Sequence, residues 1–457
     1  MIAGLGPYPV TRESGVPSLG LVPRHWQVRR LRTAVEMRVS NVDKHAHEGG
    51  LPVRLCNYVD VYKNDRIHST MPFMRATATR DELTRFGISD GDVLITKDSE
   101  SWDDIGVPAL VVDSADDLVC GYHLAMLRPS AGLLSGAYLF RLIQSTGVAH
   151  QLHVNANGVT RYGLTHSGIK SVWLPIAPRD EQDLIVRFLD HADVRIRRYI
   201  RAKQRLIELL EEQQQAIIHR AVTRGLDSNA PLKPSGVDWL GDVPDHWRGG
   251  RLKAICSMKS GAAITTAAIE PSGDYPVYGG NGIRGYSTRY THTGEFALVG
   301  RQGALCGNVH IVRGSFWASE HAVVVTPRSG YDLEWLGALL RVMNLNQYSL
   351  AAAQPGLAVE RIRELRVAVP NILEQQAIVR HVDRQTAPMT DAAERARKEI
   401  ELLHEYRTRL IADIVTGKLD VREAAAALPN EPNVVAEMDE FGLVDGADYL
   451  NVDEASA

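Results

Sequence analysis

Apolar residues recur every three or four positions in two stretches of the chain, which predicts two long amphipathic helices. The first seam comprises Ile196, Tyr199, Leu206, Leu210 and Ile217, with Lys203 and Gln213 in its remaining positions. The second comprises Ala393, Ala396, Ile400, Leu403, Leu410 and Ile414, with Arg407 in its missing position. Such a narrow seam needs a partner. Either each helix packs on its own globular domain, or the two helices pair with each other.

Prolines indicate where these helical regions begin. Pro178 and Pro370 each precede a charged stretch containing Glu-Gln, which predicts a short helix of about a dozen residues at each place. Pro388 is unfavourable inside a helix, so the second long helix is expected to begin near Thr386. Each long helix then has about 30 residues and spans about 45 Å.

Between the helical regions the pattern changes to short β-branched runs flanked by Gly or Asp, which predict strands. These runs are 92–96, 109–112, 296–299, 309–312 and 322–326, and helical segments are expected at 137–144 and 333–343. Both regions therefore read as mixed α+β domains.

The chain contains an internal repeat. Residues 14–31 (SGVPSLGLVPRHWQVRRL) and 235–252 (SGVDWLGDVPDHWRGGRL) share 11 of 18 positions at an offset of 221. A second match, at an offset of 193, pairs residues 163–190 with 356–383 and continues through 208–227 and 401–420. The stretches between the matched frames do not resemble each other, and the first is 28 residues longer. A duplicated frame that holds two divergent inserts is typical of a scaffold that presents two different recognition domains.

The repeat divides the chain into five regions. We expect a first recognition domain at 1–178, a helical region at 179–227, a second recognition domain at 228–370, a second helical region at 371–422 and an acidic tail at 423–457. If the two helices pair antiparallel, a pseudo-two-fold axis relates the halves. In the tail an alanine run could extend the helix, and the acidic stretch that follows is expected to be disordered.

Charge is distributed unevenly. The net charge is −4, but the tail carries nine acidic residues and no Lys or Arg, and the second insert (248–370) has 13 basic against 8 acidic residues. A basic surface is the usual electrostatic footprint of nucleic-acid binding, although a surplus of this size is weak support. The four cysteines form no Cys-x-x-Cys spacing, no apolar run is long enough to cross a bilayer, and the start lacks a secretory signal, so we expect a cytoplasmic protein with reduced thiols.

The repeated motifs resemble those of the specificity subunit of type I restriction-modification systems. They are the paired elements at 20–26 (GLVPRHW) and 241–247 (GDVPDHW), the Glu-Gln-x-x-Ile-Val-Arg elements and the long heptad helices. The second insert adds YPVYGGNGIRGY, GRQGALCGNV and FWASEHAV, which are similar to one recurrent type of recognition domain, and the first insert is similar more loosely through NYVDVYKND, GDVLITK and NGVTRYGLT.

The resemblance implies a function for the whole chain. It implies two target recognition domains joined by two long antiparallel coiled-coil helices, a subunit that reads a bipartite sequence in double-stranded DNA, and no catalytic activity. Partners would be two methyltransferase subunits that use S-adenosylmethionine and two motor-nuclease subunits that use ATP and Mg²⁺. The sequence contains no phosphate-binding loop, methyltransferase Asn-Pro-Pro-Tyr-like motif or nuclease Glu-x-Lys core that we could identify. The alternatives are a self-sufficient methyltransferase or nuclease with an unrecognised site, and a coiled-coil interaction scaffold.

Candidate DNA-binding residues are polar or aromatic side chains that could reach base edges or phosphates. They are Asn57, Tyr58, Lys63, Lys97, Ser99, Trp102, His123 and Arg161 in the first domain, and Asn281, Arg284, Arg289, Arg301, Gln302 and His321 in the second. Candidates for helix pairing or partner contact are Trp26, Trp247, Ile196, Leu206, Leu210, Ile217, Ile400, Leu403, Leu410 and Ile414.

Two further patterns have ordinary structural explanations. Gly280, Gly282 and Gly285 form a Gly-x-Gly-x-x-Gly string, but the β-like sequence after it offers no helix to receive a pyrophosphate, so a tight turn is expected. His45, His47 and Glu48 have no distant matching cluster, so we expect a solvated loop and no metal.

Overall fold

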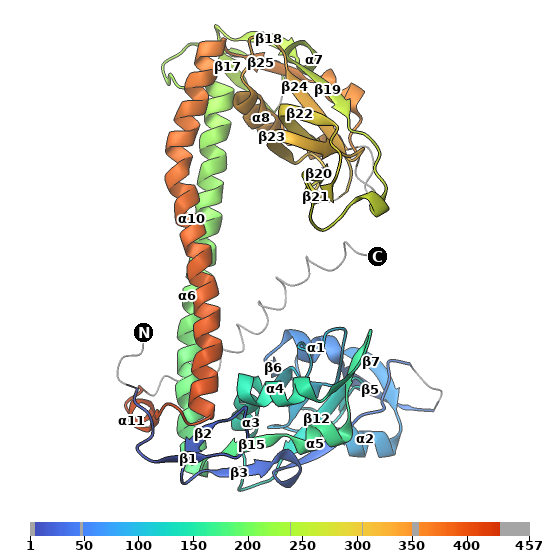
Figure 1. The fold of residues 1–457 in the computed structure, drawn as a ribbon, viewed down its shortest axis with the longest axis vertical. Coiled ribbons are helices and arrows are strands. Elements are labelled where there is room, and N and C mark those ends of the chain that lie inside the picture. Colours follow the sequence, from blue (N-terminus) through green and yellow to red (C-terminus); the bar gives the residue numbers. More distant parts are fainter. Residues whose placement is uncertain (1–4, 46–48, 238, 304, 350–355, 430–457) are drawn as a thin grey trace. The chain divides into compact units, whose positions relative to one another are not determined.

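The computed structural model describes residues 5–45, 49–237, 239–303, 305–349 and 356–429. The chain divides into two compact units, here called unit 1 (residues 1–203 and 398–457) and unit 2 (residues 204–397). Two long helices each contribute one segment to each unit (Figure 1). The acidic part of the tail that we expected to be disordered, residues 430–457, lies outside the described residues. In the described parts of the chain no helix is both long and apolar enough to cross a membrane.

Both long helices are longer than the sequence predicted. Helix α6 covers Arg179–Arg224 and helix α10 covers Ile372–Val415, with 46 and 44 residues. The predicted break between a short and a long helix is wrong in both repeats, and α10 does not begin near Thr386 but runs through Pro388. A proline inside a helix removes one backbone hydrogen bond and costs about 3 kcal/mol. Packing along the rest of the helix therefore outweighs this local cost.

The two helices pair antiparallel, as predicted. In unit 1, Arg407 Nε donates to Asp193 Oδ1 at 2.9 Å, and Lys203 Nζ lies 2.6 Å from Glu399 Oε2. In unit 2 the helices are joined by an ion pair of Arg397 with Glu211 and by two hydrogen bonds from Gln214 Nε2, to Thr390 Oγ1 at 3.0 Å and to the Thr386 carbonyl at 3.3 Å. The partner on α10 falls in number as the residue on α6 rises, which defines the antiparallel direction within each unit.

The apolar seam of α6 differs in part from the predicted one. Ile196 is buried and Leu210 and Ile217 are half-buried, whereas Tyr199, Leu206 and Gln213 are exposed, Leu206 to 41%. The alternate positions of the seam are instead one residue later, at Ile200, Ile207 and Gln214. Both choices repeat every 3.5 residues on average, so spacing alone did not separate them. On α10 the second seam is buried or half-buried at every predicted position: Ala393, Ala396, Ile400, Leu403, Arg407, Leu410 and Ile414.

The first recognition domain, in unit 1, contains a five-stranded sheet in the order β4-β12-β8-β10-β6 and a three-stranded sheet in the order β11-β5-β7. The strands of these sheets are β4 (Val35–Val39), β5 (Leu51–Cys56), β6 (Arg66–Ile67), β7 (Met74–Ala78), β8 (Val93–Thr96), β10 (Pro108–Val111), β11 (Leu118–Cys120) and β12 (Leu124–Pro129). A small third sheet joins β9 (Asp98–Ser99), β13 (Ala156–Gly158) and β14 (Tyr162–Leu164). The helices are α1 (Tyr58–Lys63), α2 (Arg80–Phe86), α3 (Gly136–Gln144), α4 (Thr146–Val154) and α5 (His166–Ser171).

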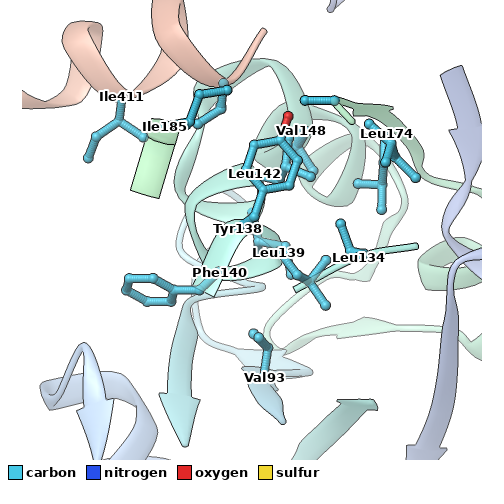
Figure 2. Packing of buried hydrophobic residues seen from close by; sticks show 14 of the residues in the cluster. Val93, Leu134, Tyr138, Leu139, Phe140, Leu142, Val148, Leu174, Ile185 and Ile411 are labelled. Carbon is cyan, nitrogen blue, oxygen red and sulfur yellow. The ribbon is translucent and has the colours of Figure 1, made fainter. Parts of the chain in front are cut away.

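One hydrophobic core joins this domain to the long helices. Helix α3 is central to it: Tyr138, Leu139 and Leu142 are fully buried and pack with Ile185 of α6 and Ile411 of α10 (Figure 2). The Tyr138 hydroxyl donates to the Pro175 carbonyl at 3.1 Å, so its polar group is satisfied. The recognition domain and the helical segments of unit 1 are therefore a single packed body.

The second recognition domain, in unit 2, is built on a six-stranded sheet in the order β19-β24-β22-β23-β20-β21. The strands are β19 (Cys256–Ser260), β20 (Tyr275–Gly279), β21 (Gly282–Ser287), β22 (His292–Gly300), β23 (Val309–Ala318) and β24 (Ala322–Pro327), and the helices are α7 (Leu252–Ile255), α8 (Leu333–Val342) and α9 (Val359–Arg363). Helix α8 buries Trp335 and Leu339 in a core that includes Val222 of α6 and Ile378 of α10. The strands and helices predicted in both inserts are confirmed.

The internal repeat is confirmed by matching elements in the two units. A strand pair formed by β1 (Thr11–Glu13) and β2 (Leu21–Pro23) in unit 1 corresponds to β16 (Leu232–Pro234) and β17 (Asp242–Pro244) in unit 2. A second pair, β3 (Gln27–Arg30) with β15 (Trp173–Ile176), corresponds to β18 (Arg248–Arg251) with β25 (Arg366–Val369). In each unit the second pair is where the chain enters and leaves the recognition domain. The alanine run does not extend α10: it forms a separate short helix, α11 (Arg422–Ala426).

The His-Trp motif of each repeat binds the glutamate at the start of the following long helix. In unit 1, Trp26 Nε1 donates to Glu181 Oε1 at 3.1 Å, and His25 Nε2 lies 2.8 Å from Glu181 Oε2. The Tyr8 hydroxyl donates to the same carboxylate. Unit 2 repeats the arrangement, with Glu374 bound by Trp247 at 2.9 Å and by His246 at 3.0 Å. We call this arrangement the glutamate clamp.

The neighbouring glutamine of each Glu-Gln element makes a second repeated contact. Gln182 Oε1 accepts from the Ser135 backbone N–H at 2.9 Å, and Gln375 Oε1 accepts from the Asp332 backbone N–H at 2.8 Å. Ser135 and Asp332 are the N-cap residues of α3 and α8. The Glu-Gln element therefore ties the start of a long helix to both the His-Trp motif and the recognition domain.

Replacing the clamp glutamates is expected to destabilise the two units unequally. Glu181→Ala leaves two buried donors, Tyr8 and Trp26, without an acceptor, which we expect to cost about 2–4 kcal/mol. Glu374→Ala leaves one buried donor, Trp247, and should cost about half as much. Urea unfolding followed by tryptophan fluorescence measures both losses. Equal losses in the two variants would contradict this account.

A buried ionic network joins the first recognition domain to the long helices in unit 1. Arg141, with a side chain 1% exposed, lies 2.7 Å from both Asp190 and Asp193 of α6. Arg407 of α10 contacts Asp193 and also Asp65, at 3.1 Å. Burial alone would raise the pKa of Asp193, but Arg141 and Arg407 hold that pKa far below its ordinary value. The network is therefore fully ionised at neutral pH.

Removing Arg141 from this network leaves two buried carboxylates with only part of their compensating charge. Arg141→Met is expected to cost about 3–5 kcal/mol because Asp190 and Asp193 lose their nearest cation. The matched control is Arg179→Met, because Arg179 forms an exposed ion pair with Asp183, and both of these residues belong to α6. This exposed pair should contribute at most about 1 kcal/mol to stability. Chemical unfolding of both variants tests the difference, and similar small losses would show that the network contributes little.

Candidate nucleic-acid interface

Four of the predicted residues of the first domain lie together beyond the ends of β5, β8 and β11. The backbone N–H of Gly121 donates to the Cys56 carbonyl at 2.8 Å, and that of Lys97 donates to the His123 carbonyl at 3.0 Å. These bonds hold the segments that carry Tyr58, Lys97, Ser99 and His123 beside one another. These residues are far apart in the sequence, and the folding of the sheets brings them together.

Asp98, which the sequence analysis did not single out, changes the charge of this cluster. Its Oδ2 atom lies 2.5 Å from Lys97 Nζ and 2.7 Å from His123 Nδ1. One carboxylate therefore compensates the positive charge of Lys97, one of the predicted DNA-binding residues. The sequence signal that could have predicted this compensation is that Lys97 is followed directly by an acidic residue.

Asn57 has a structural role that limits its use in recognition. Its side-chain oxygen accepts from the backbone N–H groups of Val59 and Asp60 and caps α1. Tyr58, the next residue, stacks on Tyr62 at a centroid distance of 5.4 Å. Burial raises the pKa of the Tyr58 phenol, against a lowering contribution from its hydrogen bond with Ser99. Tyr58 is therefore a neutral aromatic group at physiological pH.

The remaining predicted residues of the first domain are more accessible. Trp102 is 50% exposed and packs edge-to-face against His153, and Arg161 is exposed in the turn between β13 and β14. Lys63 is the last residue of α1 and is half-buried. Acidic residues are interspersed with them, including Asp104, which accepts from the Tyr62 hydroxyl at 2.7 Å. This surface offers aromatic contacts more than a concentration of positive charge.

In the second domain five of the six predicted residues gather at one end of the six-stranded sheet, and Arg289 lies beyond the other end of β21. The tip of the β20–β21 hairpin, the connection from β22 to β23 and the start of β24 meet there. The backbone N–H of Arg301 donates to the His321 carbonyl at 2.8 Å, and Gln302 Oε1 lies 2.7 Å from His321 Nδ1. Asn281 accepts from Asn308 at 2.9 Å. Asn308 was not among the predicted residues, although it lies within the GRQGALCGNV motif.

The three predicted arginines of this domain differ in how firmly neighbouring residues hold them. Arg284 lies at the irregularity of the β20–β21 ladder, where Val277 pairs with Gly285 and Tyr278 with Ile283, so it is the extra residue of a β-bulge and is exposed. Arg289 stacks over Trp317 at 5.6 Å. Arg301 is tied to Ser260 at 3.2 Å. Arg284 therefore has the greatest freedom to reach a ligand.

The glycine string lies in this hairpin, with Gly282 and Gly285 at φ values of 101° and 147° in β21. A strand follows the string, so the arrangement that binds a dinucleotide at a helix N-terminus does not form. His45 is exposed beside Asp43, and His47 and Glu48 lie outside the described residues. Across the part of the chain that the structure describes, no three His, Cys, Asp or Glu residues are arranged to hold a metal ion. The four cysteines are buried as thiols.

The helix-pairing and partner-contact candidates divide by exposure. Trp26 and Trp247 are each 1% exposed and are occupied by the glutamate clamp, so neither is available on the surface of its unit. Ile196, Leu410 and Ile414 are buried; Leu210, Ile217, Ile400 and Leu403 are half-buried; Leu206 is exposed.

Comparison with known proteins agrees with the resemblance seen in the sequence. Residues 244–402 match the family described as type I restriction modification DNA specificity domain. The chain is 47% identical over 137 residues (29% of its length) to the "Type I restriction enzyme EcoprrI specificity subunit" of Escherichia coli, and 28% identical over 124 residues (26% of its length) to the "Putative type I restriction enzyme specificity subunit S.HindORF215P" of Haemophilus influenzae. It spans about a third of these relatives, 34% and 32% of their lengths.

The fold is shared with a solved structure. A chain from work on complex assembly and conformational transition of the type I R-M system matches with a TM-score of 0.64 and 16% identity, over 87% of this chain and 99% of that chain. At this identity the likeness concerns the fold: two recognition domains of mixed helix and strand joined by long paired helices.

The salt dependence of DNA binding distinguishes the free from the compensated cations. Arg284→Ala should reduce the slope of log K against log salt by about 0.9, the value for one phosphate contact. Lys97→Ala should change the slope much less, because the Lys97 charge is already shared with Asp98. Titrations of duplex DNA at several salt concentrations measure both slopes. A larger effect of Lys97→Ala than of Arg284→Ala would contradict the assignment.

Proposed function

We propose that this chain is the sequence-specific DNA-binding subunit of a type I restriction-modification complex and reads a bipartite target. The observation that carries the proposal is the duplicated frame: the same strand pairs, glutamate clamp and helix recur in both units, and each copy holds a recognition domain of different structure. The family match over 244–402 covers most of the second recognition domain and most of α10. Two different domains on one repeated frame suit the reading of two different half-sites.

The chemistry of reading is divided between the loops of each domain. Arg284 and Arg161 are exposed cations that suit phosphate contact, which positions the protein without specifying sequence. Amide side chains such as Gln302 and Asn281 suit base edges in the major groove. In the first domain the aromatic groups of Tyr58 and Trp102 suit apolar contact with bases or sugars.

The long helices would act as the ruler between the half-sites. Each is continuous, so an axial rise of 1.5 Å per residue is maintained over 46 residues in α6 and 44 in α10. Polar contacts in each unit fix the antiparallel register. A rod with fixed register holds a fixed length, and that length would set the unspecified spacer in the DNA target.

This chain would recognise the DNA sequence, and its partner subunits would carry out methylation and cleavage. We expect it to assemble in the cytoplasm with two methyltransferase subunits, which bind S-adenosylmethionine, and two motor-nuclease subunits, which use ATP and Mg²⁺. Both relatives reported above are named as specificity subunits, which supports this division. A chain that methylates or cleaves DNA without partners would contradict it, and incubation of the purified chain with labelled S-adenosylmethionine and duplex DNA tests that alternative.

Lengthening the rod should lengthen the spacer and leave the half-sites unchanged. Seven residues inserted after Leu210 and seven after Ala393, at facing segments of α6 and α10 in unit 2, preserve the 3.5-residue seam. The added 10 Å or so of helix corresponds to about 3 base pairs of DNA. Sequencing of methylated sites in cells that express the complex reads both half-sites and the spacer.

The control carries the same seven residues in the loop after Ser228, outside both helices. It should leave the spacer unchanged. If the helical insertion also leaves the spacer unchanged while methylation persists, the helices do not act as the ruler.

A further inference from the structure

We propose that Asn281 and Asn308 act together as one reader of adenine in the half-site of the second recognition domain. The inference rests on the proposed function and assigns a specificity role to a residue pair at one end of the six-stranded sheet. The Asn308 amide donates to the Asn281 side-chain oxygen at 2.9 Å, and both side chains are exposed.

The backbone fixes the position of both asparagines. Asn281 stands at the tip of the β20–β21 hairpin, and Asn308 precedes β23, where its carbonyl accepts from the Gly300 N–H at 2.9 Å. Gly280 and Gly300 let the two segments approach: a Cβ added at Gly300 would lie 2.0 Å from the Gly280 carbonyl oxygen. The hairpin tip and the β22–β23 connection thus pack backbone against backbone, which holds the two amides in place before a ligand arrives.

The hydrogen-bonding groups that remain free on the two asparagines predict what the pair can recognise. Each asparagine has one oxygen and one amino group, and the bond between them uses one oxygen and one N–H. Whichever amide is the donor, the pair keeps one free oxygen and one free amino group. Neither side chain forms another hydrogen bond with the described residues. The pair therefore presents an acceptor beside a donor.

Adenine is the base that matches this pattern. On its major-groove edge N7 accepts and the N6 amino group donates, whereas guanine presents two acceptors, cytosine one donor, and thymine an acceptor beside a methyl group. Guanine would place one of its acceptors against the free oxygen of the pair. A single asparagine contacts adenine through both of its groups, and here the same two functions come from two fixed residues.

The surroundings of the pair are suited to a base contact. Gln302, on the same connection, has its oxygen engaged by His321 at 2.7 Å, so its amino group is left as a donor. Arg284 and Arg301 lie on the hairpin and connection that carry the pair, where cations can contact phosphates. By contrast, the Asn57 oxygen of the first domain is occupied by a helix cap. The Asn281–Asn308 pair is thus an uncharged, exposed and preorganised element beside cationic groups.

The test uses the full-length chain purified with its methyltransferase partner and a library of randomised DNA duplexes. Wild type should select a bipartite sequence that has adenine at a fixed position of one half-site. Asn308→Ala and Asn281→Ala should each lower the preference for that adenine by roughly 5- to 150-fold and leave the other half-site unchanged. Asn308→Asp should shift the preference towards cytosine, because the pair would then present acceptors to the cytosine amino group.

The control is Thr293→Ala. Thr293 and Ser315 form an exposed cross-strand hydrogen bond of 2.9 Å on β22 and β23, at the far ends of these strands from the asparagine pair. This variant should keep the wild-type sequence preference. Thermal melting of every variant shows whether the domain remains folded.

The outcomes separate the two proposals. If wild type selects no sequence, the proposed function fails. If wild type selects a bipartite sequence and the asparagine variants keep the adenine, the adenine-reader inference is wrong. It is equally wrong if folded asparagine variants lose affinity for all sequences alike, since that result indicates that the pair only fixes the hairpin tip.

Discussion

The polar contacts that set the register of α6 against α10 are the constraint on which both units depend. Asp193 and Arg407 meet in unit 1, and the positions 193 residues away from them, Thr386 and Gln214, meet in unit 2. The repeat therefore makes the same interhelical contact twice, once with charged groups and once with neutral groups. Apolar side chains tolerate a shift along a helix, but a buried polar side chain tolerates only the partner that satisfies it.

The charged version also ties the recognition domain to the helices. In unit 1 the network extends from Arg407 and Asp193 to Arg141 of α3 and to Asp65 beside β6. In α8, the position that corresponds to Arg141 of α3 is occupied by Ala338. The glutamine contact and an apolar core hold the recognition domain in both units, through Gln182 in unit 1 and Gln375 in unit 2. The ionic network is thus an addition of unit 1 to an attachment that both units share.

The sequence predicted the elements better than their continuity. Periodicity identified both helices, but Pro388 suggested a start that the structure does not have, because packing along α10 exceeds the local cost of the proline. The choice between Leu206 and Ile207 was not accessible, since both fit a 3.5-residue repeat and only the partner helix selects one. Contacts between distant segments were also missed: Asp98 beside His123, Asn308 beside Asn281 and Glu181 beneath Trp26 each depend on the tertiary fold.

The paired strands that close each recognition domain have a consequence for how such a protein changes over generations. Chain entry and exit lie side by side, at Gln27–Arg30 against Trp173–Ile176 and at Arg248–Arg251 against Arg366–Val369. Whatever is inserted between them must begin and end at neighbouring points and offer a helix to the glutamine and the core of the frame, but the strand pair itself sets no length for it. Recombination between duplicated coding segments can therefore exchange one whole module for another in one genetic event, while the strand pairs and long helices of the frame are inherited intact.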